Sequence, residues 1–377
     1  MTSGRSFLLG EINYMTKRTN KFLLILVSLL ASFNLTACST QSKDTAPAKT
    51  AVTTTPTSDT QFLMGTVCTI KIYNKHQQKA LKAGFKRIKQ LATETTVNQK
   101  GSEIDKINKY AGIKPVKVTP TIYRMCKDAY YYSKISAGTF DLTIGPITSL
   151  WRIGFPDAHK PKASTIKKRL PLINYHNVVF NDQKQTVFLK KKKMMLDLGG
   201  MAKGFISDEV MKVLQKNGVT SAIIDLGGNV YVMGNSPTNN SNWTVGIQDP
   251  SAARGDAIGS LPQKNATAVT SGIYERYLKV GNKVYSHLMN PQTGYPCQNN
   301  LLSVTIIAKR STTGDGLSTA VFNRGLKKGY DYVEHKPGVE AIFITKKKKV
   351  YITSGLKNKF KLFSGNGYQL AKLKTNN

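Results

Sequence analysis

The sequence predicts an α+β fold for a single large domain over residues 61–372, and two observations carry this prediction. Segments whose apolar residues recur at the spacing of one helix face are interspersed with segments that have the alternating, β-branched pattern of strands. In addition, 40% of the 377 residues are hydrophobic and 9% are aromatic, which is enough to fill a core and too apolar for a disordered chain. Neither a repeat nor an internal linker interrupts this region.

Helices are expected where the apolar spacing is that of a helix face. Leu81, Phe85, Ile88 and Leu91 predict a helix over 79–93. Similar spacing predicts a helix over 120–137, and a further helix over 202–217 follows the Gly199-Gly200 pair directly. Two shorter helices are expected on either side of 320–335.

Strands are expected where alternation and β-branched residues dominate. The opening strand covers 62–73, and a strand pair surrounds the Asn181-Asp182 turn. The remaining strands are expected over 221–233, 243–248, 274–280, 302–308, 338–344 and 350–352. Strand order does not follow from these patterns.

The amino-terminal segment predicts export. Basic residues precede the apolar run 22–30, which continues weakly to residue 33 and is shorter than the ~20 residues that span a bilayer. This layout is typical of a secretory signal. The following Leu35-Thr36-Ala37-Cys38 resembles a bacterial lipobox, so 1–37 is interpreted as a lipoprotein signal peptide and Cys38 as the lipidated residue. The alternative is a soluble secreted protein with a chance cysteine.

Residues 38–60 are interpreted as a flexible, lipid-anchored tether, because they are rich in Ser, Thr and Pro and poor in large apolar residues. Removal of 1–37 takes away four basic residues and one acidic residue, so the formal charge falls from +34 to +31. On the extracytoplasmic face of the membrane such a chain meets anionic lipids and wall polymers, and no nucleic acid partner is expected.

Glycine clusters beside Asp, Ser or Thr mark the candidate site. They lie at 136–147, 196–205, 224–235, 270–278 and 314–323. Glycine turns that lead into helices expose N–H groups that can hold phosphate oxygens. The chain lacks the G-x-x-x-x-G-K-[ST] and G-x-G-x-x-G patterns, so neither a P-loop nor a Rossmann dinucleotide site is indicated.

Asp315 and Thr319 stand four residues apart, so a helix that starts near 316 places them on one face. Their oxygens, with a nearby carbonyl, form a hard donor set suited to Mg²⁺. The competing interpretation, which spacing alone favours, is that Asp315 caps that helix.

His287 is the one histidine in a dense polar and glycine-rich setting, at 285–297, although a lone histidine is more often structural or exposed than catalytic. No Ser-His-Asp or Cys-His arrangement is indicated. The absence of C-x-x-C spacing excludes a Cys zinc site. Cys68 and Cys126 lie on apolar periodic segments typical of a core, and the role of Cys297 stays open.

Taken together, eight segments in order along residues 60–370 resemble the ApbE family of flavin transferases (FAD:protein FMN transferases), which are often exported lipoproteins. They are Met64-Gly65-Thr66, 102–108, 138–146 with Leu150-Trp151, 197–204, Gly227-Gly228-Asn229, 270–276, 287–296 and 315–320.

The resemblance implies the family's α+β fold, which is related to the T-fold, and FAD as substrate. The residues implied to bind FAD are Met64, Asn98, Thr139, Phe140, Asp141, Asp197, Lys203 and Leu288. Mg²⁺ is implied to be held by the Gly200 carbonyl, Asp315 and Thr319, with Ser318 close by, and His287 matches the catalytic histidine.

The implied reaction is attack by a threonine hydroxyl of an exported acceptor protein on the FMN-side phosphorus of FAD, with AMP leaving. Mg²⁺ and Lys203 would neutralise developing charge, and His287, with an ordinary pKa near ~6.5, would take the proton. Acceptors in such systems carry a D-G-x-[ST]-G-A-T motif. Asp315 to Val321 looks superficially similar, but those residues are assigned to metal, so self-flavinylation is not expected.

One departure concerns the segment after the histidine, where the family often has Ile-Asp-Pro and this chain has Met289-Asn290-Pro291. Two alternatives to the transferase stay open. One is a FAD pyrophosphatase that releases FMN and AMP to water, and the other is a non-catalytic lipoprotein that binds flavin or polyanion.

Overall fold

The structure is a computed structural model, and it describes residues 51–97 and 100–373. The predicted signal peptide, Cys38 and Asn98 lie outside the described residues. No helix within the described ranges is both long and apolar enough to cross a membrane.

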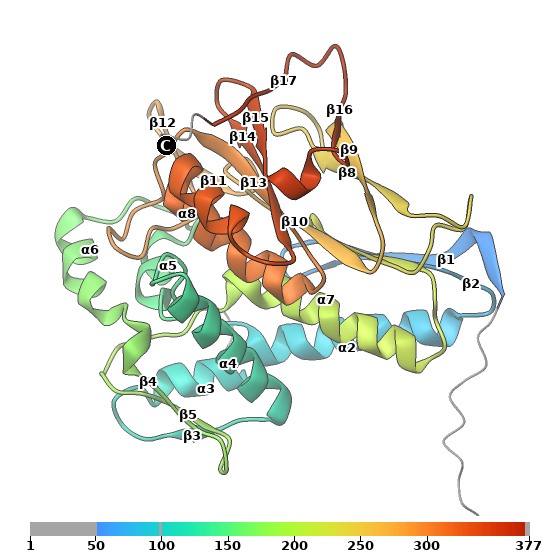
Figure 1. Ribbon diagram of the computed structural model, residues 1–377. Coiled ribbons are helices and arrows are strands. Elements are labelled where there is room, and N and C mark those ends of the chain that lie inside the picture. Colours follow the sequence, from blue (N-terminus) through green and yellow to red (C-terminus); the bar gives the residue numbers. More distant parts are fainter. Residues whose placement is uncertain (1–50, 98–99, 374–377) are drawn as a thin grey trace, which may run out of the picture. The chain divides into compact units, whose positions relative to one another are not determined.

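In the described part of the chain, the centre of the domain is a nine-stranded sheet (Figure 1). The strands, in their order across the sheet, are β1 (Val52–Leu63), β2 (Thr66–Asn74), β6 (Ala222–Leu226), β7 (Asn229–Met233), β10 (Ala266–Gly272), β13 (Leu301–Ala308), β14 (Val339–Thr345), β15 (Lys349–Ile352) and β17 (Gln369–Leu370). Neighbours pair antiparallel except β15 and β17, which are parallel.

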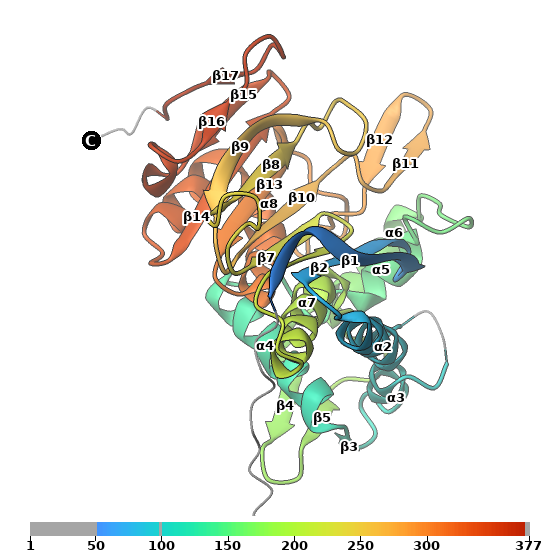
Figure 2. The same ribbon diagram turned by 90° about the vertical axis from the view of Figure 1, so that its right-hand side faces the viewer.

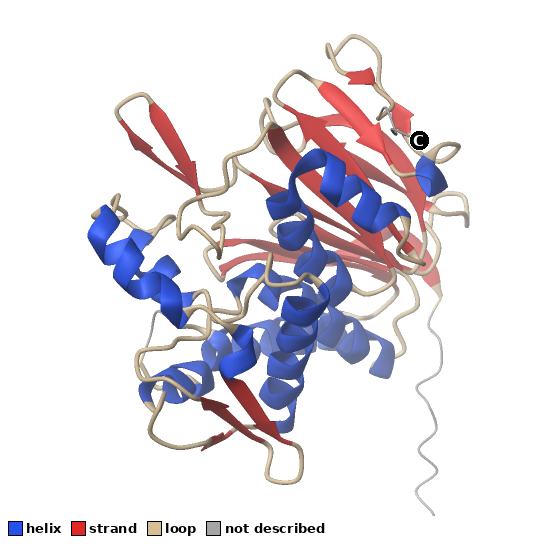
Figure 3. Ribbon diagram, turned by 60° about the vertical axis from the view of Figure 1, so that its left-hand side comes forward, coloured by secondary structure: helices blue, strands red, loops and turns tan. Residues whose placement is uncertain are grey.

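Helices α2 (Gln78–Thr95), α7 (Gly199–Lys216) and α8 (Ser311–Glu334) pack against one face of this sheet (Figure 3). Helix α7 lies between the other two and contacts both, and α4 (Pro120–Ile135) packs against α7 and α8. Apolar side chains of the strands and helices, such as Ile70, Ile224 and Phe205, are buried in one continuous core between these layers. This burial supplies most of the driving force for the fold.

A smaller sheet covers the opposite face (Figure 2). Among the described residues it contains β16 (Lys361–Leu362), β9 (Ala257–Gln263) and β8 (Trp243–Gln248), in that order. Trp243, Ile258 and Ile344 belong to the apolar cluster between the two sheets. Because β7, β10 and β14 are covered on both faces, their buried residues are not restricted to alternate positions.

The remaining elements lie around these layers. They are α3 (Glu103–Lys109), α5 (Gly145–Trp151), α6 (Ala163–Arg169), the sheet formed by β3 (Val116–Lys117), β5 (Thr186–Leu189) and β4 (Val178–Asn181), the 3₁₀ turns η1 (Leu170–Leu172), η2 (Tyr175–Asn177) and η3 (Ser354–Leu356), and the hairpin of β11 (Tyr277–Val280) and β12 (Lys283–Ser286). The β11–β12 hairpin projects from the body of the domain (Figure 2).

The helices expected from periodicity are confirmed as α2, α4 and α7, and the strand pair around Asn181-Asp182 is confirmed as β4 and β5. The two shorter helices expected around 320–335 are instead parts of α8. Gly325, with φ 74°, interrupts the helical backbone and kinks α8 there.

The amino-terminal boundary of the domain is corrected by β1. Residues 52–60, assigned to the flexible tether, pair with β2 as an edge strand, so the domain begins near Val52 rather than at residue 61. Their Thr-rich composition resembles that of a linker because most of the side chains are exposed. Threonine nevertheless favours strands through its branched Cβ, and pairing with β2 satisfies the backbone.

Several predicted strands are hairpins. Met64 and Gly65, at φ 55° and 67°, form a turn that divides the expected opening strand into β1 and β2. Gly227 and Gly228 likewise divide 221–233 into β6 and β7. Strands β3, β9, β10, β12, β16 and β17 were not expected. Part of β10 lies within the glycine cluster at 270–278, and its Thr267 and Ser271 are polar yet buried, so β10 lacks the alternating pattern of an amphipathic strand.

Candidate functional site

The amino-terminal halves of α7 and α8 approach each other at Gly204. A Cβ atom at this position would lie 2.3 Å from the carbonyl oxygen of Ser311 and 2.6 Å from Cβ of Asp315, so no larger residue fits without displacing a helix. The Gly204 N–H donates to Oδ2 of Asp315 at 2.8 Å. The glycine of the 197–204 motif therefore positions the carboxylate of the 315–320 motif.

Asp315 does not cap its helix. Helix α8 begins at Ser311, four residues earlier, and its first N–H groups are satisfied from α7. Asp208 accepts from the backbone N–H of Ser311 (2.8 Å) and of Thr312 (3.0 Å). The capping interpretation of Asp315 is therefore wrong, because Asp208 already fills that role.

Asp315 instead lies in a cluster of oxygen atoms. Thr319 follows it by one helical turn, and a Cβ atom at Gly200 would lie 3.6 Å from the Thr319 hydroxyl. Ser271 of β10 donates to the Ser318 hydroxyl at 2.8 Å and lies 3.5 Å from that of Thr319. Ser318 in turn donates to the Asp315 carbonyl at 3.0 Å. Gly200, Ser318 and Thr319 thus lie close together, and the Ser318 hydroxyl connects them to the backbone of Asp315, while binding of a metal by these residues stays a prediction.

The donor set contains a single carboxylate. Among the described residues no group of three or more His, Cys, Asp or Glu side chains is placed to hold a metal ion. The cluster consists of carboxylate, hydroxyl and backbone oxygens, which suit a hard cation that keeps several waters and also binds substrate phosphates. The residues therefore fit Mg²⁺ held jointly with a phosphate ligand.

Lys203 brings a positive charge to this cluster. Its Nζ lies 3.9 Å from Oδ1 of Asp315, and 30% of the Lys203 side chain is exposed, against 5% for Asp315. Burial raises the pKa of Asp315, while the Lys203 charge and the Gly204 N–H act in the opposite direction. A buried carboxylate whose pKa is raised in the absence of a cation is a group that gains from binding one.

His287 follows β12 directly. Its backbone N–H donates to the carbonyl oxygen of Arg276 at 3.0 Å, and its Nδ1 lies 3.2 Å from the same oxygen. Because a carbonyl only accepts, Nδ1 carries the hydrogen and Nε2 is left as the proton acceptor.

Burial, and then the Lys203 charge, lower the pKa of His287 to about 4. This value lies well below ~6.5, the ordinary pKa of a histidine side chain. The imidazole is therefore neutral at pH 7, and it is a weaker base than an exposed histidine.

Arg276 connects His287 to the β1–β2 turn. Its guanidinium donates to the carbonyl oxygens of Gly65 (3.0 Å) and Met64 (3.3 Å). Met64 thus sits, with its backbone in the left-handed region, next to the residue that orients the histidine. A non-glycine residue that the surrounding structure keeps in a sparsely populated backbone conformation is a frequent feature of ligand sites.

The 139–141 segment borders the same cluster. The Phe140 ring lies 3.1 Å from where a Cβ atom of Gly200 would be. Asn323 of α8 donates from Nδ2 to the carbonyl oxygens of Thr139 and Met289, each at 2.9 Å. This amide joins the 139–141 segment to the chain that follows His287.

The carboxylate of Asp141 is fully engaged inside the protein. Oδ1 accepts from the N–H (2.8 Å) and hydroxyl (2.7 Å) of Thr143, and Oδ2 accepts from the Tyr175 N–H at 3.1 Å. Burial raises its pKa against these hydrogen bonds. Asp141 therefore shapes the turn, and its contact with FAD stays a prediction.

Asp197 and Leu288 complete the set of described site residues. Asp197 accepts from the Thr148 hydroxyl at 2.7 Å and from the Gly199 N–H at 2.9 Å, which places it at the amino terminus of α7. The Leu288 side chain is buried, and its carbonyl oxygen accepts from Cys297 N–H at 2.7 Å. Leu288 can therefore face a ligand only through its backbone or after rearrangement.

Residues that organise the site were missed as candidates. Ser271, Arg276 and Asn323 hold Ser318, His287 and the Thr139 carbonyl respectively. All three lie inside or beside the glycine-rich segments, so proximity to a motif was the signal that could have found them. Their roles depend on partners distant in sequence, which spacing does not reveal.

The remaining sequence features have structural explanations. Asn290 accepts from the backbone N–H of Gln292 (2.8 Å) and Thr293 (3.3 Å), so an amide oxygen serves this turn as well as the family's carboxylate would. Burial raises the pKa of the thiols of Cys68 and Cys297 to about 11 and that of Cys126 to about 12. None of the three is a thiolate nucleophile at neutral pH.

The arrangement combines a neutral imidazole, an oxygen cluster for a hard cation, a lysine and the amino terminus of α7. Helix amino termini and lysines attract phosphate oxygens, and a neutral imidazole accepts a proton. This set suits nucleophilic displacement at a phosphate ester or anhydride.

Comparison with known proteins agrees with this chemistry. Residues 64–343 match the model of the ApbE family. A protein of Klebsiella pneumoniae named FAD:protein FMN transferase is 36% identical over 308 residues, which cover 82% of this chain and 95% of the relative. A protein of the same name from Treponema pallidum is 31% identical over 315 residues, covering 79% of this chain and 87% of the relative.

Solved structures share the fold. The crystal structure of an ApbE protein from Thermotoga maritima aligns with a TM-score of 0.74 and 28% identity, over 80% of this chain and 98% of that one. A flavin transferase ApbE from Vibrio cholerae aligns with a TM-score of 0.69 and 22% identity, over 83% and 98% respectively.

Proposed function

Because the chain belongs to the ApbE family, we propose that it is a flavin transferase that moves FMN from FAD to a threonine hydroxyl of an acceptor protein. Two named FAD:protein FMN transferases match it over most of their length. The observation that supports the proposal most is that Lys203 links two other motifs, because it lies near Asp315 and its charge acts on His287. Lys203 is within 3.9 Å of Asp315, and its charge contributes to the lowered pKa of His287.

In the proposed reaction the acceptor hydroxyl oxygen forms a bond to the FMN-side phosphorus. The bond from this phosphorus to the oxygen that bridges the two phosphates breaks, and AMP leaves with that oxygen. The hydroxyl proton passes to Nε2 of His287, whose Nδ1 hydrogen is held by the Arg276 carbonyl. The neutral state of His287 at pH 7 leaves Nε2 free to accept it.

Charge stabilisation is proposed to come from Lys203 and from the oxygen cluster. Asp315, Thr319 and the Gly200 carbonyl, with Ser318 close by, would hold Mg²⁺, which supplies positive charge against the diphosphate when bound. Lys203 stays partly exposed and can reach a phosphate oxygen. A diphosphate next to Lys203 would also offset the charge that lowers the pKa of His287, so substrate binding is expected to strengthen the base.

We propose that FAD lies along the connected segments that carry Met64, 139–141, Asp197, Lys203 and Leu288. Arg276 and Asn323 join these segments to each other. The acceptor is proposed to be an exported protein with a D-G-x-[ST]-G-A-T motif. An anchor through lipidated Cys38 at the extracytoplasmic face of the membrane is proposed from the lipobox resemblance.

The test is to incubate the full chain, purified in detergent, with FAD, Mg²⁺ and a tagged acceptor that carries this motif. A flavin-fluorescent acceptor band on a denaturing gel, absent with His287→Ala, is the expected result. AMP release without a labelled acceptor would favour the pyrophosphatase. Binding of FAD with neither product would favour a non-catalytic flavin-binding protein.

A further inference from the structure

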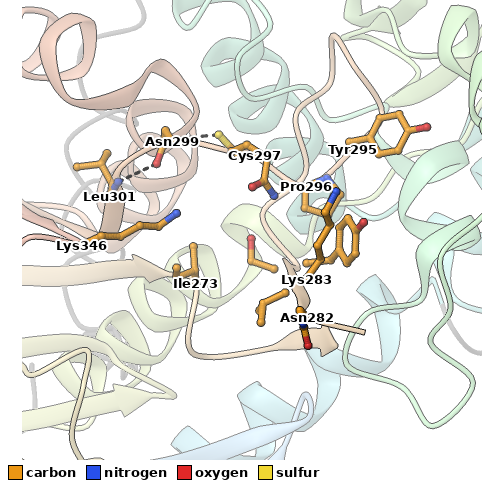
Figure 4. A pocket seen from close by; sticks show the side chains of 13 residues that line it. Ile273, Asn282, Lys283, Tyr295, Pro296, Cys297, Asn299, Leu301 and Lys346 are labelled. Carbon is orange, nitrogen blue, oxygen red and sulfur yellow. Dashed lines mark hydrogen bonds between the residues drawn. The ribbon is translucent and has the colours of Figure 1, made fainter. Parts of the chain in front are cut away.

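A cavity of about 600 Å³ lies beside the site and is not used by the proposed chemistry. It is bordered by residues 282–286, by 295–299, and by Ile273, Leu301 and Lys346 (Figure 4). Residue 286 immediately precedes His287, so the cavity reaches the chain next to the proposed base.

The cavity runs along the edge of a strand. Successive residues of a strand point to opposite faces, so a cavity that touches all of residues 282–286 borders the edge of β12 rather than one face. Among the described residues β12 pairs only with β11. Its second edge therefore presents backbone N–H and C=O groups that lack a neighbouring strand.

The same edge is already paired just beyond His287. Cys297 N–H donates to the Leu288 carbonyl at 2.7 Å, and Met289 forms an antiparallel bridge with Pro296. The pairing stops at the cavity. An extended segment placed in the cavity would continue the row of residues 295–297 along β12.

The cavity also holds a buried polar group in need of a partner. Ser286 is 4% exposed and lines the cavity, and its hydroxyl has no hydrogen-bond partner in the described structure. An unsatisfied buried hydroxyl costs free energy that a ligand group can recover.

The ionisable groups at the cavity indicate the charge of its occupant. Lys283 and Lys346 line it from opposite sides (Figure 4), and no acidic side chain is among its lining residues. Neither lysine has an ion pair within the described ranges. On the hairpin, Tyr277 (56% exposed) and Val284 (49%) add exposed apolar surface of the kind found at protein interfaces.

We propose that this cavity is the docking site of the acceptor protein, which adds an extended, acidic segment to the free edge of β12. The inference rests on the proposed function, since it names where the partner of that reaction binds. Strand addition supplies affinity through main-chain hydrogen bonds, and the two lysines select for acidic residues. The site delivers the acceptor alongside His287.

The test measures binding without catalysis. The full chain in detergent is titrated, without FAD, against a fluorescent peptide DGASGAT, and its anisotropy is followed. Val284→Asp and Lys346→Glu are each expected to weaken binding by about tenfold or more. The matched controls are Val179→Asp, an exposed valine on edge strand β4, and Lys117→Glu on β3, which are expected to bind as the unmodified chain does.

A charge reversal separates recognition from structural damage. The peptide KGASGAT is expected to bind Lys346→Glu better than it binds the unmodified chain. Equal affinity of DGASGAT for all variants, or no binding to the unmodified chain, would overturn the inference. Sedimentation velocity gives a further contradicting outcome. If the unmodified chain is a dimer, and Val284→Asp dissociates it without changing the affinity for the peptide, then the β12 edge pairs with a second copy of this chain and the inference is overturned. Binding at β12 without flavin transfer would leave this inference standing and refute the proposed function.

Discussion

Replacing Asp315 by Asn tests whether the oxygen cluster binds a cation. The Asp315 carboxylate is buried, and burial raises its pKa, so the ionised form is disfavoured when no cation is present. Asparagine keeps an oxygen that can accept from the Gly204 N–H, now at 2.8 Å. Without metal, Asp315→Asn is therefore expected to be as stable as the unmodified chain or more stable.

Magnesium should make the unmodified chain more stable than Asp315→Asn. A cation that binds only the folded state at a hundred times its dissociation constant adds about 2.7 kcal/mol. Because the unfolding entropy is about 2.1 cal/mol/K per residue, 1 kcal/mol shifts the melting temperature of a domain that spans residues 52–373 by roughly 1.5 °C. The melting temperature of the unmodified chain should therefore rise by about 4 °C. Asp315→Asn should lose most of this rise because the carboxylate is the one charged donor in the cluster.

The assay is thermal unfolding with EDTA and with increasing MgCl₂. The matched control is Asp225→Asn, because burial also raises the pKa of Asp225, and its oxygen accepts from a backbone N–H at 2.8 Å, that of Gly228. That variant should keep the magnesium response. An equal magnesium response in Asp315→Asn, or no response in the unmodified chain, would refute the metal assignment.

Three further predictions concern Lys203, Gly204 and Cys38. Lys203→Gln should raise the pKa of His287 above about 4, because a positive charge that disfavours the imidazolium is removed; NMR titration of the imidazole measures this, and an unchanged pKa would contradict it. Gly204→Ala should lower the free energy of unfolding by about 1–3 kcal/mol in a denaturant titration, since its Cβ would meet the Ser311 carbonyl oxygen at 2.3 Å. If Gly204→Ala is as stable as the unmodified chain, helices α7 and α8 can move apart without cost and this reasoning is wrong. Cys38→Ala should move the protein from the membrane fraction to the soluble fraction without changing its chemistry, and retention in the membrane would refute the lipobox interpretation.

The sequence predicted the elements whose pattern is local. Helices α2 and α4 have an apolar stripe that packs on the core, and their predicted limits are close to the observed ones. The tether boundary failed because β1 is an exposed edge strand, whose polar composition is that of a linker. Residues 52–60 form a strand because they pair with β2, and this pairing cannot be predicted from the sequence of either segment alone.

The candidate site was found by resemblance more than by spacing. Spacing left Asp315 as a helix cap, and only the observed start of α8 at Ser311, with Asp208 as its cap, removes that interpretation. The lowered pKa of His287 was also not predictable, since it depends on burial and on Lys203 from another motif. Contacts between segments far apart in sequence determine both.

The central claim is that FMN passes from FAD to a protein hydroxyl with His287 as the base. The most direct measurement is a single-turnover reaction of the full chain with FAD, Mg²⁺ and acceptor, in which AMP, free FMN and acceptor-bound FMN are quantified together. The proposed mechanism predicts one acceptor-bound FMN for each AMP, no free FMN, and loss of both products in His287→Ala. Equal amounts of AMP and free FMN, or an undiminished yield in His287→Ala, would contradict it.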